Sequence, residues 1–141
     1  MLYPLIQQQL ERDEGRRDKG YLCSGGYWTI GVGHNVEAGP AIPGSAIDII
    51  CENDIRLVMD QISKRLPWAL QLDPVRHGAL VNLTFNIGID NVIKRNPQML
   101  LALQAKDWNL AAQELLDGNY KDQVGQRAYR LAKQFEGGQW T

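Results

Sequence analysis

The stretch Tyr27-Trp28-Thr29-Ile30-Gly31-Val32-Gly33-His34-Asn35 decides how this 141-residue chain is interpreted. Large apolar residues alternate with small ones along it, and a period of two is typical of a β-strand. One predicted face carries Trp28, Ile30 and Val32, and the other carries Thr29, Gly31 and Gly33. Because the second face has almost no side-chain bulk, we expect a ligand to approach the backbone closely there, at Gly31.

This strand lies in a glycine-rich region at about residues 16–44, which we interpret as a small antiparallel β region. Gly25-Gly26 marks a hairpin turn before the strand. A three-residue loop over 24–26 would place Cys23 on the same face as Thr29. A two-residue loop at Gly25-Gly26 would place it beside Trp28 instead, and the sequence leaves both registers open.

A helix is predicted over residues 2–14 from the apolar stripe Leu2, Leu5, Ile6 and Leu10, with Gly15 as its stop signal. Glu14 continues that stripe at the helix end. Two interpretations stay open for its carboxyl group. Partial burial would raise its pKa and suit it to be a general acid, whereas an ordinary surface glutamate would carry no such role.

From residue 45 onward the periodicity is helical. It predicts one or two helices up to Leu66, a helix over 75–87 that is apolar nearly all round, and three further helices starting near 97, near 108 and before 128. The expected fold is therefore α+β and mainly helical. We expect one domain over 1–141, with a helical lobe at about 45–141 plus the helix over 2–14, and a cleft between this lobe and the β region.

Composition narrows the class of protein. Lys+Arg total 15 against 16 Asp+Glu, so the net charge of -1 excludes nucleic-acid binding through global positive charge. No run approaches the ~20 apolar residues of a membrane span, and no ordinary signal peptide is recognised at the start.

Cys51 is expected to be a small apolar residue on a helix stripe. With only two histidines we expect no metal site, and we predict a structural ion pair between His34 and Asp54.

Taken together, these motifs resemble a known family. Glu14-Gly15, Tyr21 and the stretch 27–35 closely resemble the start of the bacteriophage lysozymes, glycoside hydrolase family 24. The segments 75–88, 107–112 and 125–131 resemble later helices of that family, in the same order. The resemblance therefore covers nearly the whole chain and implies a lysozyme-like fold.

The resemblance also implies an activity, the cleavage of the bond between N-acetylmuramic acid and N-acetylglucosamine in peptidoglycan. Glu14 falls on the family's general acid. Cys23 and Thr29 fall on the residues that hold the attacking water, in the spacing Glu-x8-Cys-x5-Thr, where the family admits Asp or Cys in the middle. Cys23 is either a water-orienting group or a nucleophile. Phe85 and Asn86 fall on residues that line the cleft.

A thiol with an ordinary pKa of ~8.5 is mostly neutral near pH 7, and an ionised glutamate nearby would raise that pKa further. Cys23 therefore also supports an alternative, a peptidoglycan-binding or spike-type module that has lost catalysis. A transglycosylase outcome on the same scaffold is a third. We expect peptidoglycan glycan strands as partner, no cofactor, a monomer, synthesis in the host cytoplasm, and holin-assisted export to the periplasmic peptidoglycan.

Overall fold

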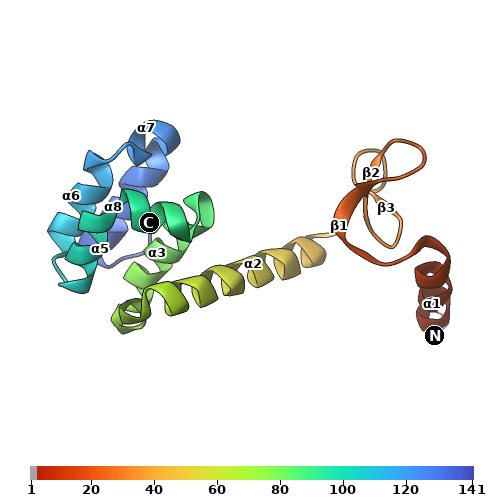
Figure 1. The fold of residues 1–141 in the computed structure, drawn as a ribbon, viewed down its shortest axis with the longest axis horizontal. Coiled ribbons are helices and arrows are strands. Elements are labelled where there is room, and N and C mark those ends of the chain that lie inside the picture. The colour runs from red at the N-terminus through yellow and green to blue at the C-terminus, as the bar shows by residue number, and fades with distance from the viewer. Residues whose placement is uncertain (1–2) are drawn as a thin grey trace. The chain divides into compact units, whose positions relative to one another are not determined.

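The computed structural model describes residues 3–141, and the chain divides into two compact units, one up to Ile49 and one from Ile50 to Thr141. Helices dominate, and a small three-stranded antiparallel sheet accompanies them (Figure 1). This confirms the predicted α+β, mainly helical fold class. The single-domain prediction with a cleft between lobes is not tested by this division and stays a prediction.

The first unit contains one helix and the sheet. Its elements are α1 (Tyr3–Glu14), β1 (Arg17–Leu22), β2 (Trp28–Gly31) and β3 (His34–Asn35), with the strands in the order β1-β2-β3. The helix ends at Glu14, as its sequence predicts, and the predicted start at Leu2 lies outside the described residues. The apolar stripe of α1 is exposed, and the helix has no buried residue.

The central strand β2 is shorter than the alternation predicts. It ends at Gly31, because Gly31 and Gly33 both have a positive φ and turn the chain back into β3. The prediction of an open face was wrong at Thr29, which is 3% exposed, whereas Trp28 on the other face is 48% exposed. Thr29 pairs with Tyr21 on one side and Asn35 on the other, and these neighbouring strands shield its short side chain.

The second unit is entirely helical. In chain order its elements are α2 (Gly44–Arg65, which begins in the first unit), the 3₁₀ turn η1 (Pro67–Gln71), α3 (Pro74–Ile87), α4 (Ile89–Arg95), α5 (Pro97–Gln104), α6 (Trp108–Asp117), α7 (Tyr120–Val124) and α8 (Gln126–Gly137). The sequence periodicity missed η1, α4 and α7, because elements of five to seven residues are too short to show a helical repeat. None of the helices within residues 3–141 is long and apolar enough to cross a membrane.

Helix α3 packs against α8 and α4 in this unit. Asp73 caps its start by accepting hydrogen bonds from the backbone N–H groups of Val75 and Arg76. The helix buries Ala79, Leu80, Leu83 and Thr84. The prediction that α3 is apolar and buried nearly all round was wrong, because Phe85 is 47% exposed and Asn86 is exposed too.

Most of the remaining core comes from α5, α6 and α8, whose facing apolar side chains include Met99, Leu103, Leu115, Leu131 and Phe135. Helix α2 contacts this core near its end, through the buried Ile62 and the partly buried Val58, with Leu66 following directly after the helix. Cys51 on the same predicted stripe is exposed and not a packed apolar residue. The long stripe of α2 therefore packs in its last turns only.

Candidate functional site

Glu14 is the last residue of α1, and its side chain faces the turn between β2 and β3. A Cβ atom at Gly33 would lie 3.6 Å from both Cγ and Oε2 of Glu14, so the glycine lets the turn approach the carboxylate closely. Arg16 bonds to Glu11 instead, at 2.7 Å. Glu14 is exposed in this structure and makes no ion pair with the residues that it describes.

The strand register decides where Cys23 lies. Tyr21 pairs with Thr29 and Leu22 pairs with Trp28, while the Cys23 backbone N–H donates to the Tyr27 carbonyl at 3.0 Å. The loop therefore has three residues, 24–26, closed by a hydrogen bond from Gly26 N–H to the Cys23 carbonyl at 2.9 Å and a positive φ at Gly26. Of the two registers left open, the structure has the one that places Cys23 on the same face as Thr29.

The hairpin loop also changes the acidity of Cys23. Hydrogen bonds from the Tyr27 backbone N–H, the Thr29 hydroxyl and the Gly25 backbone N–H favour the thiolate, in that order of size, and hold the pKa of Cys23 below its ordinary value. These hydrogen bonds act on the pKa of Cys23 in the opposite direction to the ionised glutamate considered from the sequence. The Thr29 hydroxyl donates a hydrogen bond to the Tyr27 carbonyl at 3.1 Å. The Cys23 thiolate and the Tyr27 carbonyl therefore compete for the same hydroxyl proton of Thr29.

Gly31 borders open space. A Cβ atom there would meet nothing within 4 Å, and the glycine lines a depression of about 550 Å³ together with Arg16, Arg17, Asp18 and Val32. Arg17 also lies over the Tyr21 ring, 4.9 Å from its centre. The surface around Gly31 is therefore accessible and carries two arginines, although its predicted role in substrate binding stays a prediction.

His34 begins β3 opposite Ile30, and its Nε2 atom is buried with no hydrogen-bond partner among the described residues. Asp54, its predicted ion-pair partner, is on the part of α2 that belongs to the second unit. The His34–Asp54 pair remains a prediction. No group of three or more potential metal-ligating side chains gathers within residues 3–141.

The two predicted cleft residues lie at the end of α3 in the second unit. Phe85 lines a groove of about 540 Å³, whose other walls include Met59, Val81 and the Trp140 side chain. The Trp140 ring packs directly on Gly78, which leaves no room for a side chain at that position. Asn86 is exposed next to this groove and is not among its lining residues. Substrate binding by Phe85 and Asn86 stays a prediction.

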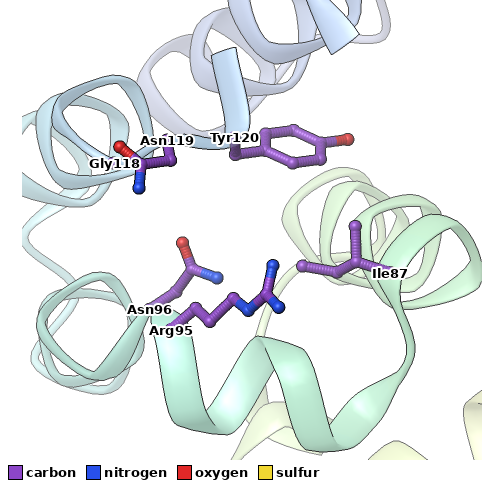
Figure 2. A pocket seen from close by; sticks show the side chains of 6 residues that line it. All are labelled: Ile87, Arg95, Asn96, Gly118, Asn119 and Tyr120. Atoms are coloured by element: carbon purple, nitrogen blue, oxygen red, sulfur yellow. The ribbon is translucent and has the colours of Figure 1, made fainter. Parts of the chain in front are cut away.

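Sequence reasoning missed another pocket of the second unit, shown in Figure 2. It has a volume of about 410 Å³ and lies between the α4–α5 junction and the α6–α7 turn. It is lined by Ile87, Arg95, Asn96, Gly118, Asn119 and Tyr120. The only sequence signal here was Asn96-Pro97, which predicts a helix start and says nothing about a pocket.

Comparison with known proteins agrees with this fold. The phage lysozyme family model matches residues 11–134. The chain is 24% identical to "Probable T4-type lysozyme 1" of Dictyostelium discoideum, over 94% of each chain. It is 37% identical to the endolysin of Salmonella phage P22, over 57% of this chain and 58% of that one. It is also 30% identical to the pre-baseplate central spike protein Gp5 of Enterobacteria phage T4, over 89% of this chain and 26% of the spike protein.

The family match covers Glu14, Cys23, Thr29 and the whole sheet, together with all helices of the second unit except the end of α8. It confirms the resemblance seen in the sequence and the lysozyme-like interpretation of the fold. A family match of this extent supports the reaction class, glycoside hydrolysis of peptidoglycan, but it does not identify the individual catalytic residues. The chain belongs to the phage lysozyme family.

Proposed function

We propose that this protein is a muramidase that hydrolyses the β-1,4 bond between N-acetylmuramic acid and N-acetylglucosamine. The observation that carries the proposal is the register of the β1–β2 hairpin, which puts Cys23 and Thr29 on one face, in a chain whose α1 ends at Glu14. These are the three residues expected from the resemblance. The family match and the similarity to a phage endolysin support the same conclusion.

In the proposed mechanism Glu14 is the general acid. Its carboxylic acid gives a proton to the glycosidic oxygen as the bond to C1 breaks and an oxocarbenium-like transition state forms. The Gly33 turn beside Glu14 leaves space at the carboxyl group, because no side chain occupies that position. The leaving sugar departs with the proton of Glu14 as a neutral alcohol.

Cys23 and Thr29 hold the water that attacks C1. The water oxygen forms the new bond to C1, and one of its protons passes to the Cys23 thiolate. The lowered pKa of Cys23 favours the presence of this thiolate, although it also makes the thiolate a weaker base. The Thr29 hydroxyl orients the same water while its own proton alternates between the Tyr27 carbonyl and the thiolate. In this scheme the cysteine replaces the aspartate that the family admits at the same position.

Turbidity loss of chloroform-permeabilised Gram-negative cells tests the proposal. Glu14→Gln keeps the shape of the side chain but cannot give up a carboxylic proton, so we expect lysis to fall by about 10²–10⁴. Cys23→Asp should retain lysis and Cys23→Ala should lose it, and alkylation of Cys23 should depress it. Asp13→Asn, one residue earlier on α1, is the matched control and should lyse cells like the unmodified protein.

Full lysis by Glu14→Gln would end the general-acid assignment. Binding to walls without lysis by the unmodified protein would favour the alternative, a peptidoglycan-binding or spike-type module, which the similarity to the T4 spike protein makes worth testing. Reducing sugars among the released fragments indicate hydrolysis, whereas anhydro ends would indicate a transglycosylase. A covalent sugar adduct on Cys23 would show that the thiol is the nucleophile.

The cellular setting is part of the same proposal. We propose synthesis in the host cytoplasm, holin-assisted passage to the periplasmic peptidoglycan, and action as a monomer without a cofactor. Lysis that depends on co-expression of a holin in the producing cell would support this route.

A further inference from the structure

A shallow trough lies between α6 and α8 on the surface of the helical unit, with a volume of about 450 Å³. Its floor consists of Ala112, Leu116 and Ala132, and both alanines are buried. Because alanine side chains end at Cβ, the floor stays low between the longer side chains on either side. The α6 side, from Asn109 to Asp117, spans about 12 Å at a rise of about 1.5 Å per residue, so the trough has room for a short linear ligand.

The α6 side of this α6–α8 trough carries two carboxamides. Asn109 and Gln113 are four residues apart on the helix, so their side chains lie on the same face, and both residues are exposed. Each carboxamide offers a donor and an acceptor without a charge. The hydroxyl and acetamido groups of a sugar need both kinds of partner.

The α8 side carries an aromatic ring. Tyr129 is 47% exposed, although tyrosine rings are large apolar surfaces that folding usually covers in good part. Next to a floor of alanines, the uncovered ring offers an apolar surface of the kind on which the C–H face of a pyranose can stack. A half-exposed ring beside carboxamides on a facing helix thus has both the apolar and the polar partners of a sugar.

The charges of the trough argue against a charged ligand. Asp117, Lys133 and Glu136 are exposed, and none of them forms an ion pair with the residues that the structure describes. The two carboxylates outnumber the single ammonium group, so the trough repels nucleic acid and other anionic polymers. A cationic peptide would meet Lys133, which follows Tyr129 by one helical turn. An uncharged ligand avoids both penalties.

We propose that the α6–α8 trough binds an uncharged stretch of an N-acetylhexosamine glycan, with Tyr129 stacked on one ring and the two carboxamides of α6 bonded to its polar groups. The source of that glycan, peptidoglycan, rests on the proposed function, whereas the chemistry of the trough does not. None of Glu14, Cys23 and Thr29 lines the trough. It therefore takes no part in the chemical step and holds the polymer through a second contact, which raises the local concentration of glycan.

Two-dimensional amide NMR of the isotope-labelled full chain tests the proposal, with the uncharged tetramer of N-acetylglucosamine as the probe. We expect the side-chain amide signals of Asn109 and Gln113 and the backbone signal of Tyr129 to shift as the tetramer is added. Tyr129→Ala should weaken the affinity measured at these signals by about fivefold to tenfold, since one stacking contact is lost. Gln113→Ala should weaken it by about fivefold, since one hydrogen bond is lost.

Two variants serve as controls. Tyr129→Phe keeps the ring and should keep most of the affinity. Tyr3→Ala removes an exposed tyrosine of α1 that does not line the trough, and it should leave the affinity at Asn109 and Gln113 unchanged. Far-UV circular dichroism checks that each variant is folded, which we expect because the replaced side chains are exposed.

Several results would overturn the proposal. Shifts confined to residues around Glu14, Cys23 and Thr29 would place the tetramer at the proposed cleavage site alone. An equal loss of affinity in Tyr129→Phe and Tyr129→Ala would exclude stacking, and an equal loss in Tyr3→Ala would exclude a specific site. Tighter binding of the deacetylated, cationic tetramer at the same signals would show a site for cations instead of an uncharged glycan.

The outcome is separable from that of the proposed function. If Glu14→Gln abolishes lysis but the tetramer shifts no signal of the trough, the muramidase stands and this inference falls. If the tetramer binds at the trough but the unmodified protein does not lyse cells, the inference stands and the muramidase falls.

Discussion

Arg76 holds the end of α8 against the start of α3, and its replacement gives a sharp test of how the helical unit is stabilised. Its guanidinium donates to the carbonyls of Phe135 at 2.6 Å and Glu136 at 2.9 Å, and to the Asp73 carboxylate at 2.9 Å. It also lies over the Trp108 ring, 4.1 Å from its centre. The side chain is only 13% exposed.

The expected loss in Arg76→Leu follows from these contacts. The two carbonyls belong to the last turn of α8, where no helical N–H reaches them. Leaving the Phe135 carbonyl unpaired costs about 1–3 kcal/mol, and the Glu136 carbonyl costs less because water reaches that exposed residue. The Asp73 carboxylate is 38% exposed, so loss of its ion pair adds about 1 kcal/mol or less. We expect the free energy of unfolding to fall by about 3 kcal/mol in total.

Urea unfolding followed by far-UV circular dichroism measures this change. With a slope of about 2 kcal/mol per molar urea, the midpoint of the helical unit should fall by about 1.5 M. Lys64→Ala is the control, because its ion pair with Asp60 joins two exposed side chains within one helix, and we expect a loss of about 0.5 kcal/mol or less. A loss below about 1 kcal/mol in Arg76→Leu would refute the reasoning that these carbonyls depend on Arg76.

Three further predictions concern particular residues. Gly138→Ala should destabilise the helical unit by about 1–2 kcal/mol in the same urea assay, because φ at Gly138 is +63° and the new Cβ would lie 2.6 Å from the Arg76 guanidinium. Gly137→Ala is the control and should not destabilise it, because open space surrounds Gly137. Equal losses in the two variants would contradict this reasoning. Burial alone would raise the pKa of Asp73, but its hydrogen bonds and charge interaction with Arg76 and the Val75 N–H outweigh this and lower it. The contribution of Asp73 to stability is therefore present above its unfolded pKa of about 3.9 and is lost as pH falls through the lower folded pKa. Asp73→Asn should therefore flatten the loss of stability between about pH 5 and pH 2. An unchanged slope of unfolding free energy against pH would rule this out. For the predicted His34–Asp54 pair, a double-mutant cycle with His34→Ala and Asp54→Ala should give a coupling of at least about 0.5 kcal/mol, and additive losses would count against it.

Local sequence signals were sufficient to predict the ends of helices that have clear caps and stop signals. Asp73-Pro74 and Gly88 bound α3, and Gly15 ends α1, because caps and stops act within a few residues of the chain. The family resemblance likewise came from linear spacing, Glu14 to Cys23 to Thr29, and needed no coordinates. The short helices α4 and α7 escaped detection because five to seven residues do not complete two helical turns.

Properties that depend on neighbours distant in sequence needed the tertiary structure. The pairing of Leu22 with Trp28 decided the face of Cys23. Hydrogen bonds from the hairpin lower the pKa of Cys23, an effect that the sequence does not reveal. Thr29 is buried because two strands flank it, which alternation along one strand cannot show. The Arg95 and Asn96 pocket joins residues from separate helices. The sequence by itself thus determined the fold class and the candidate catalytic triad, while strand register and helix packing decided the environment of each group, because pKa and burial depend on contacts in space and not on position along the chain.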